Sequence, residues 1–243
     1  MTTEPAHGHA AIIGFGLMGC DIAAIFLAGG WRVTAVEPDR ASWPARLDRV
    51  TLSLGQLGGA ARRVDALDLV ASLDDVGFGD ADVVVEAVPE KLELKQQVFR
   101  DLDAIAPAAT IFASNTSGFP IGQIAEVTQR PELVIGWHWA SPPLVMRLAE
   151  IVRGPATSDA TVATIVELAT ACNKNPVVIK DSPDGTWGFV ANRVYMRMIQ
   201  EANACIDEGI ATREQVDALM VDCFRWPVGP FGMVQGASSG WGQ

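Results

Sequence analysis

The feature that most constrains the fold of this chain is a glycine motif between two apolar segments. An apolar run over residues 10–14 leads into the letters GFGLMG, residues 14–19, and a helical pattern follows as far as residue 30. In such a strand–turn–helix, Gly14 permits the tight turn, Gly16 lets a pyrophosphate approach the backbone, and Gly19 lets the helix pack on the strand. The motif predicts a dinucleotide-binding unit. A glycine turn without a nucleotide is the alternative.

An acidic residue at the end of the next strand pattern supports the dinucleotide interpretation. Residues 31–36 form that pattern, and Glu37 follows it, eighteen positions after Gly19. A carboxylate there accepts the hydrogen bonds of an adenosine ribose and repels a 2′-phosphate, so NAD is favoured over NADP. Asp21 is expected close to the pyrophosphate, where its charge suits the helix dipole but opposes the ligand.

The only histidine beyond the first nine residues, His138, precedes Glu150 by twelve positions. Residues 133–137 form a short apolar run that predicts a buried parallel strand, which places His138 at a strand end, where open α/β sheets bind ligands. Residues 145–152 form a second extended segment that would bring Glu150 back beside it. A carboxylate on the far nitrogen of imidazole fixes the tautomer of a general base. The alternative is a structural histidine that donates to a backbone carbonyl.

The remaining strand and helix patterns predict a doubly wound, mostly parallel α/β sheet over residues 1–183, followed by a short helical domain over residues 184–243. Further strands are expected at residues 67–72, 82–88, 110–113 and 176–179. Helices are expected at residues 91–106, 157–172, 190–205 and 212–224, with a glycine-rich tail from residue 229. The small polar residues 114–118 follow a strand and suggest ligand binding, although a plain turn uses the same residue types. Arg46, Arg49, Arg62 and Arg63 are interpreted as a solvated helix face.

Composition excludes several classes of protein. The hydrophobic content of 49% suits a globular core, and no apolar run approaches the roughly 20 residues of a membrane span. The first ten residues have no signal-peptide pattern and are expected to be a disordered tail. Four cysteines without a CxxC pair argue for reduced thiols in a cytoplasm, and against a zinc site. The net charge of −11 argues against nucleic acid as a partner.

Several motifs together give the chain a family resemblance, collinear from residue 12 to residue 231. They are GFGLMG (14–19), VVVEAVPEKLELK (83–95), FASNTS (112–117), the twelve-residue step from His138 to Glu150, GFVANR (188–193) and GPF (229–231). With them the chain resembles the L-3-hydroxyacyl-CoA dehydrogenases, in particular the 3-hydroxybutyryl-CoA dehydrogenases. The resemblance implies an oxidoreductase of acyl metabolism that moves a hydride between NAD and C3 of a 3-hydroxyacyl-CoA, without a metal.

The resemblance also implies roles for single residues. His138 would be the general base, Glu150 its orienting partner, Ser117 a donor to the substrate oxygen and Asn192 a further polar contact. The residues expected to bind the cofactor are Gly14, Gly16, Leu17, Met18, Gly19, Glu37, Glu90, Lys95, Asn115 and Ser141.

Three departures from the family pattern bear on substrate choice. Ser141 stands where the family usually has asparagine, the basic helical arm that in some members receives the CoA phosphates is shorter, and residues 184–187 are inserted before the Asn192 motif. Residues 26–33 and the pair Pro142-Pro143 resemble relatives that oxidise free hydroxy acids, such as L-gulonate 3-dehydrogenase. A dehydrogenase of a free 3-hydroxy acid is therefore an alternative. A weakly catalytic nucleotide-binding protein is another, which the complete serine, histidine, glutamate and asparagine set disfavours.

The C-terminal region predicts an assembly. Family members continue after the GPF motif with further helices, whereas this sequence has twelve residues after Phe231. Two amphipathic helices and a glycine-rich tail are unable to cover apolar residues such as Val194, Met198, Ile199, Val216 and Leu219. We expect a homodimer or larger assembly with residues 190–231 at the interface, or else a shortened form of a longer protein.

Overall fold

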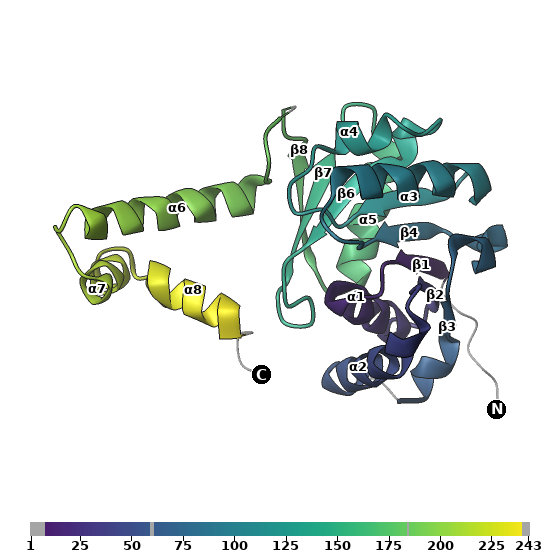
Figure 1. Cartoon of the computed structure of the whole chain (residues 1–243), viewed down its shortest axis with the longest axis horizontal. Helices are drawn as coiled ribbons and strands as arrows, with labels where there is room; N and C mark the ends of the chain where they lie inside the picture. The colour runs from purple at the N-terminus through teal and green to yellow at the C-terminus, as the bar shows by residue number, and fades with distance from the viewer. Residues whose placement is uncertain (1–7, 59–60, 184, 240–243) are drawn as a thin grey trace. The chain divides into compact units, whose positions relative to one another are not determined.

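The computed structural model describes residues 8–58, 61–183 and 185–239 (Figure 1). These residues divide into two compact units, and the division falls between Trp187 and Gly188. The sequence predicts the same change of architecture, with the boundary after residue 183.

The first unit is built on an eight-stranded sheet with the order β3-β2-β1-β4-β5-β6-β7-β8. Its strands are β1 (His9–Ile13), β2 (Arg32–Val36), β3 (Leu67–Val70), β4 (Val83–Glu86), β5 (Ile111–Ser114), β6 (Val134–Trp139), β7 (Leu148–Arg153) and β8 (Asn175–Lys180). All neighbours are parallel except β6 and β7, which are antiparallel. The carboxyl ends of β1, β4, β5 and β6 therefore meet at one edge, where doubly wound sheets bind ligands.

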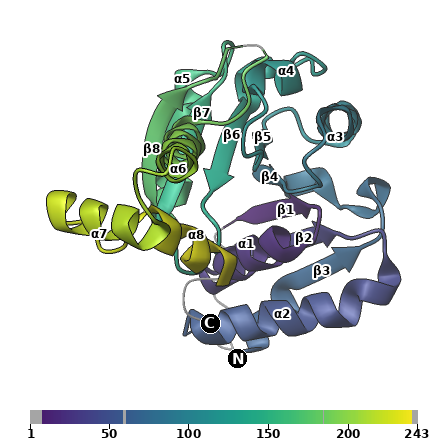
Figure 2. The same cartoon turned by 60° about the vertical axis from the view of Figure 1, so that its left-hand side comes forward.

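Helices cover both faces of this sheet (Figures 1 and 2). They are α1 (Leu17–Ala28), α2 (Trp43–Gln56), α3 (Leu92–Ile105), α4 (Ile121–Ala125) and α5 (Asp159–Ala171). Short 3₁₀ turns occupy Arg40–Ser42, Ala61–Ala66, Leu73–Asp75, Phe78–Asp80 and Pro131–Leu133. Side chains of α1, α2 and α5 share one core cluster with Trp137 and Trp139 of β6. Because neighbours along a strand point to opposite faces, His138 points to the other face of the sheet.

The central strands are short apolar runs without alternating polar residues, because both faces of the sheet are buried in the core there. The central strands β1, β4 and β5 are buried along their whole length, as expected for parallel strands covered on both faces. Aromatic rings fill the space between sheet and helices: Trp137 stacks on Trp139 with centroids 4.8 Å apart, and Phe26 meets Trp137 edge-on at 6.0 Å. This packing holds β6, and with it His138, in a fixed register.

The second unit contains the helices α6 (Val190–Asp207), α7 (Arg213–Phe224) and α8 (Pro230–Ser239). Thr212 begins α7 with a capping box that Gln215 completes. The carboxylate of Asp217 accepts hydrogen bonds from the backbone amides of Phe231 and Gly232, at 2.8 and 3.0 Å, and so caps the start of α8. No helix among the described residues has the length and the apolar character that crossing a bilayer requires.

The structure corrects four local predictions. His9 and Ala10 belong to the buried strand β1 and not to a tail, and the ring nitrogens of His9 lie 3.0 Å from the Asp80 carboxylate and 2.9 Å from the Thr34 hydroxyl; residues 1–7 lie outside the described residues. Residues 142–147 form a turn, and the extended segment begins only at Leu148.

The other two corrections concern helices. Part of the glycine-rich tail is the helix α8, which the Asp217 cap stabilises. The helix α4 was not foreseen, because five residues are too few for a periodic pattern. Its amides Ile121 and Gly122 are held by the carboxylate of Asp181, sixty positions away along the chain from Ile121.

Candidate active site

The glycine turn between β1 and α1 has the geometry that a bound pyrophosphate requires. Gly14 has φ of 94°, and a Cβ there would lie 2.7 Å from the backbone of Ala87. A Cβ on Gly19 would lie 2.1 Å from the carbonyl oxygen of Gly14, so helix and strand approach closely. By contrast, a Cβ on Gly16 would have no atom within 4 Å, which leaves open space above the turn. The residues present therefore fit NAD, whose phosphates the amino end of α1 would bind.

The acidic residue in α1 does not oppose the ligand in the way expected. Asp21 is 1% exposed, and its carboxylate accepts hydrogen bonds from Arg49 at 3.0 and 2.7 Å and from the Ser53 hydroxyl at 2.9 Å. The charge of Asp21 is thus paired with Arg49 on α2. Arg49 is correspondingly not part of a purely solvated face, as the sequence interpretation had it.

Glu37 follows β2, where the ribose of a dinucleotide is expected. One carboxylate oxygen accepts the backbone N–H of Asp39 at 3.0 Å, and the other lies 3.9 Å from Nε of Arg46. Trp43 donates its indole N–H to the Glu37 carbonyl at 2.8 Å. The carboxylate therefore has a fixed place at the edge of the sheet. Arg46, the second arginine interpreted as solvated, stands beside it.

His138 and Glu150 form a buried pair across antiparallel strands. They are register partners in β6 and β7, and Nδ1 of His138 lies 2.7 Å from Oε2 of Glu150. The histidine is 9% exposed and the glutamate 2%. A carboxylate at this distance fixes the ring and stabilises its protonated form, which is the arrangement of a positioned general base.

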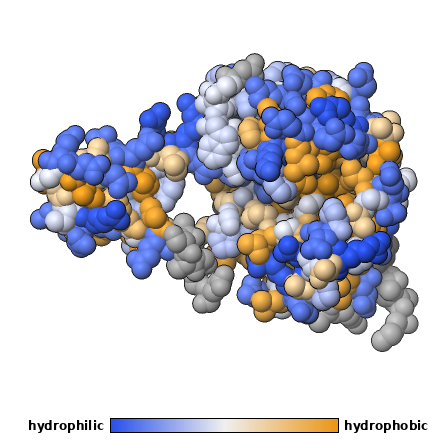
Figure 3. All heavy atoms as spheres, in the orientation of Figure 1, coloured by the Kyte–Doolittle hydropathy of each residue, from blue (hydrophilic) through white to orange (hydrophobic). Residues whose placement is uncertain are grey.

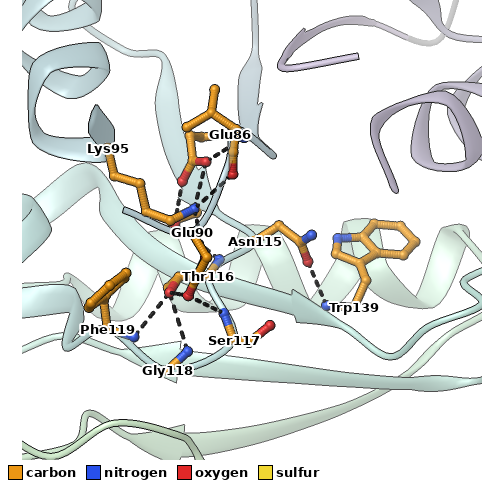
Figure 4. Close-up of polar contacts among 11 residues, drawn as sticks. Glu86, Glu90, Lys95, Asn115, Thr116, Ser117, Gly118, Phe119 and Trp139 are labelled. Carbon is orange, nitrogen blue, oxygen red and sulfur yellow. Dashed lines mark hydrogen bonds and ion pairs between the residues drawn. The ribbon is translucent and has the colours of Figure 1, made fainter. Parts of the chain in front are cut away.

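The Ser117 loop follows β5 and is held by a carboxylate from the next loop. Oε1 of Glu90 accepts the backbone N–H of Ser117 at 3.0 Å and the hydroxyl of Thr116 at 2.5 Å (Figure 4). The Thr116 oxygen in turn accepts the amides of Gly118 and Phe119, at 3.2 and 3.0 Å. The side chains of Glu90 and Thr116 therefore accept the backbone N–H groups of the loop and hold it in place.

Lys95 lies beneath this loop and not on the surface. Its side chain is 1% exposed, and Nζ contacts Glu86 at 2.8 Å, Glu90 at 3.1 Å and the Val88 carbonyl at 3.4 Å (Figure 4). Glu86 is fully buried at the end of β4. Burial raises the pKa of the Glu86 carboxyl, and Lys95, Ser114 and the Val88 amide act in the opposite direction. Lys95 is thus the cation between two carboxylates.

Asn115 connects the Ser117 loop to the strand that carries the histidine. Its side-chain oxygen accepts the backbone N–H of Trp139 at 3.0 Å, the residue directly after His138 (Figure 4). The backbone N–H of Asn115 donates to the backbone carbonyl of Glu86 at 2.8 Å. Asn115 therefore bridges the ends of β4, β5 and β6.

The turn between β6 and β7 contains Ser141, which is exposed, and is fastened by a buried lysine. Lys174 is 6% exposed and donates to the carbonyls of Pro143 and Met146, the second at 2.9 Å. Its Nζ also lies 5.5 Å from the centre of the Trp139 ring. Burial lowers the pKa of Lys174.

The first unit therefore brings most of the predicted site residues to one edge of its sheet. His138, Glu150, Ser117, Asn115 and the glycine turn lie at or next to the carboxyl ends of the central strands or on the antiparallel partner strand. Leu17 and Met18 begin α1, where Leu17 is 63% exposed. Asn192 belongs to the second unit and lies near the start of α6, half-buried. Of the predicted insertion, Asp184 lies outside the described residues.

From the sequence, Glu86, Arg46 and Lys174 receive no site role, and Thr116 is included only as one of the small polar residues 114–118. A signal existed for Glu86, since it is the one charged residue in the strand VVVE and a lysine follows nine positions later. No local pattern marks Lys174, whose partners lie about thirty positions away. Cys20 and Cys172 are free thiols whose pKa burial raises to about 12, which leaves them protonated and unsuited to nucleophilic chemistry.

A dinucleotide-binding sheet with a histidine–carboxylate pair at its carboxyl edge is typical of a nicotinamide-dependent oxidoreductase. Comparison with known proteins gives the family. Residues 9–182 match the family "3-hydroxyacyl-CoA dehydrogenase, NAD binding domain", and residues 188–243 match "3-hydroxyacyl-CoA dehydrogenase, C-terminal domain". The chain belongs to the 3-hydroxyacyl-CoA dehydrogenase family, which confirms the predicted fold, reaction class and NAD cofactor.

Individual relatives are similar to this chain over most of its length. A probable 3-hydroxybutyryl-CoA dehydrogenase of Bacillus subtilis is 36% identical over 230 residues, which are 91% of this chain and 78% of the relative. The 5-formyl-3-hydroxy-2-methylpyridine 4-carboxylate 5-dehydrogenase of Mesorhizobium japonicum is 35% identical, over 90% of this chain and 70% of the relative. The crystal structure of (S)-3-hydroxybutyryl-CoA dehydrogenase from Ralstonia eutropha superposes with a TM-score of 0.85 at 33% identity, covering 93% of this chain and 80% of that one.

Proposed function

We propose that the protein oxidises short-chain 3-hydroxyacyl-CoA esters to 3-ketoacyl-CoA with NAD, with His138 as the general base. The observation that carries this proposal is the 2.7 Å contact between His138 and Glu150, buried at the ligand-binding edge of the sheet. A short acyl chain is supported by relatives named as 3-hydroxybutyryl-CoA dehydrogenases. Such a reaction belongs to fatty-acid or short-chain acyl metabolism.

The residues of the chain divide the work as follows. His138 takes the proton of the substrate hydroxyl on Nε2, while Glu150 holds Nδ1 and stabilises the imidazolium that forms. Ser117 and Asn192 hydrogen bond the substrate oxygens. The chemistry that NAD supplies when bound is acceptance of the hydride from the same carbon.

Ten residues are proposed to hold NAD. They are Gly14, Gly16, Leu17, Met18, Gly19, Glu37, Glu90, Lys95, Asn115 and Ser141. For Lys95 the buried position favours an indirect role, through Glu90, because its ammonium already contacts two carboxylates and a carbonyl.

A second candidate substrate is a free 3-hydroxy acid. One observation favours a substrate without CoA: the relative from Mesorhizobium japonicum, whose name gives a free carboxylate and no CoA ester, is nearly as similar in sequence as the one from Bacillus subtilis. Ser141, in the place of an asparagine, lies in the turn after His138, where it would affect this choice.

The homodimer with residues 190–231 at its interface is also a proposal. It is supported by large exposed apolar side chains in the second unit, among them Val194 and Leu219. A cytoplasmic location is proposed on the free state of all four cysteines.

The first experiment measures NADH oxidation with acetoacetyl-CoA, longer 3-ketoacyl-CoA esters and free 3-keto acids. A kcat/KM highest for acetoacetyl-CoA is the expected result. A higher value for a free 3-keto acid would contradict the CoA proposal and favour the second candidate.

The general base is tested by His138→Ala, which should lower kcat about a hundredfold or more with little change in NADH affinity. Glu150→Gln keeps the size of the side chain but loses its charge, and should also slow turnover. The matched control is His9→Ala, since His9 is a buried histidine hydrogen bonded to Asp80, at the opposite ends of the strands. Turnover of His138→Ala within about threefold of the parent would refute the assignment.

A further inference from the structure

One buried carboxylate, Glu86, has no part in the proposed reaction. It is the last residue of β4, 0% exposed, in a position that a valine would fill if only packing mattered. A buried charge is costly unless it is paired and hydrogen bonded. A carboxylate at the buried end of a central strand therefore requires partners. These partners connect Glu86 to the candidate active site.

Every hydrogen bond of the Glu86 carboxylate goes to a segment that borders the site. Oε1 accepts from Lys95 Nζ at 2.8 Å and from the Val88 amide at 2.7 Å, and Oε2 accepts from the Ser114 hydroxyl at 2.6 Å. Ser114 is the last residue of β5, directly before the loop that carries Ser117. The carboxylate thus fixes the ends of two neighbouring strands and one helix.

The second link runs from Lys95 to Ser117. Oε2 of Glu90 lies 3.1 Å from Lys95 Nζ, and Oε1 of the same carboxylate accepts the backbone N–H of Ser117 at 3.0 Å (Figure 4). Glu86, Lys95, Glu90 and the Ser117 backbone are therefore joined by three consecutive charge-assisted contacts.

The ammonium of Lys95 has three hydrogens, and three acceptors lie around it. These are Glu86, Glu90 and the carbonyl of Val88. The side chain of Lys95 is 1% exposed, so its ammonium connects the carboxylates of Glu86 and Glu90 inside the protein.

We propose that Glu86 is a positioning residue: through Lys95 and Glu90 it fixes the Ser117 backbone, and with it the hydroxyl that binds the substrate oxygen. The inference rests on the role proposed for Ser117 above. It goes beyond that role by placing control of the hydroxyl in a side chain that touches neither substrate nor cofactor.

The test is a double-mutant cycle on kcat with Glu86→Gln and Ser117→Ala. Glutamine keeps the size of the side chain and still accepts a hydrogen bond, but it removes the charge that holds Lys95. In the parent background Glu86→Gln should lower kcat about tenfold, because small misplacements of a substrate-binding group are costly. In the Ser117→Ala background the same change should lower kcat by less than about twofold.

The matched control is Asp103→Asn, on the helix α3 that also carries Lys95. Asp103 is also a largely buried carboxylate paired with a cation, Arg130, at 2.7 Å, and it lies in the last turns of α3, away from the Ser117 loop. Asp103→Asn should lower thermal stability but leave kcat within about twofold of the parent in both backgrounds. A role of Glu86 in stability alone would make Glu86→Gln behave in the same way, which would overturn the inference.

The remaining outcomes separate the two proposals. A full penalty for Ser117→Ala, with an equal effect of Glu86→Gln in both backgrounds, would overturn the positioning role alone. A parent-like kcat in Ser117→Ala would contradict the substrate-binding role proposed for Ser117, and the inference with it, whereas the proposed function is tested separately by His138→Ala. If Glu86→Gln does not fold, the cycle is run with Glu86→Asp, which keeps the charge but withdraws it by one methylene, and the same loss of additivity is expected.

Discussion

At the scale of single residues, cofactor choice depends on two opposite charges at the end of β2. Glu37 is held by the Asp39 amide, and Arg46 Nε lies 3.9 Å from its second oxygen. A carboxylate here binds ribose hydroxyls and repels a 2′-phosphate, whereas a nearby arginine attracts one. As long as Glu37 is present, it offsets the charge of Arg46, so NADH should be preferred.

Removal of Glu37 should leave the charge of Arg46 without its counterpart and so change the cofactor preference. We expect Glu37→Ala to shift the ratio of kcat/KM for NADPH over NADH towards NADPH by about tenfold, and Glu37→Ala with Arg46→Ala to lose most of that shift. Steady-state kinetics with both cofactors measure the ratio. Asp48→Ala, which removes an exposed carboxylate from the same helix as Arg46, serves as the control. Equal kcat/KM values for the two cofactors in the parent would refute the role of Glu37.

Single residues also show where sequence reasoning ends. The glycine turn, Glu37 and the step from His138 to Glu150 could be predicted, because each lies in a local pattern whose geometry follows from strand and helix periodicity. The pairing of Asp21 with Arg49 could not, since it depends on how α1 packs on α2. The series of contacts from Glu86 through Lys95 and Glu90 to Ser117 could not be predicted for the same reason. It depends on how a strand end, a helix and two loops pack together.

At the scale of elements, the turn between β6 and β7 is held by hydrogen bonds from residues that lie outside the turn. Lys174, directly before β8, donates to the carbonyls of Pro143 and Met146, and the backbone N–H of Asn175 donates to the backbone carbonyl of Arg147 at 2.6 Å. This turn contains Ser141 and directly follows β6, the strand that carries His138. Its position therefore depends on a residue about thirty positions later in the chain.

We expect Lys174→Met to lower the free energy of unfolding by about 1–3 kcal/mol, because it leaves the buried carbonyl of Pro143 and the partly buried carbonyl of Met146 without their donor. It should also raise the KM for substrate through the released turn. Chemical denaturation and steady-state kinetics measure the two effects. Lys180→Met, at the exposed end of β8, is the matched control and should change neither. An unchanged KM in a destabilised Lys174→Met would show that the turn does not bear on the site.

The limits of prediction at this scale are physical. The long strands and helices of the first unit follow from apolar periodicity, and their places agree with the sequence to within a few residues. The elements that were missed, α4 and the helical part of the tail in α8, are held by distant carboxylates, Asp181 and Asp217. A cap supplied from another segment leaves no periodic trace in the helix that it stabilises.

At the scale of the whole molecule, the second unit exposes large apolar side chains. Ile210, Val194 and Leu219 are 71%, 66% and 64% exposed, and Figure 3 shows apolar residues at the surface over α6 and α7. Ile210 and Leu219 line a groove with Ala211, Gln215, Ala218 and Asp222. Burial of such side chains is worth about 25 cal/mol per Å², so a second copy of the chain would gain by covering them.

The proposed homodimer can be tested with two leucines of equal exposure. Leu219 on α7 and Leu52 on α2 are both 64% exposed, but only Leu219 lies in the proposed interface. Light scattering at micromolar concentration should give the parent a mass about twice the 25.9 kDa of one chain. Leu219→Asp should shift the protein towards the monomer, because a carboxylate in an apolar interface loses its hydration, whereas Leu52→Asp should leave the dimer intact. A parent protein that is a fully active monomer would show that the exposed residues of the second unit need no partner.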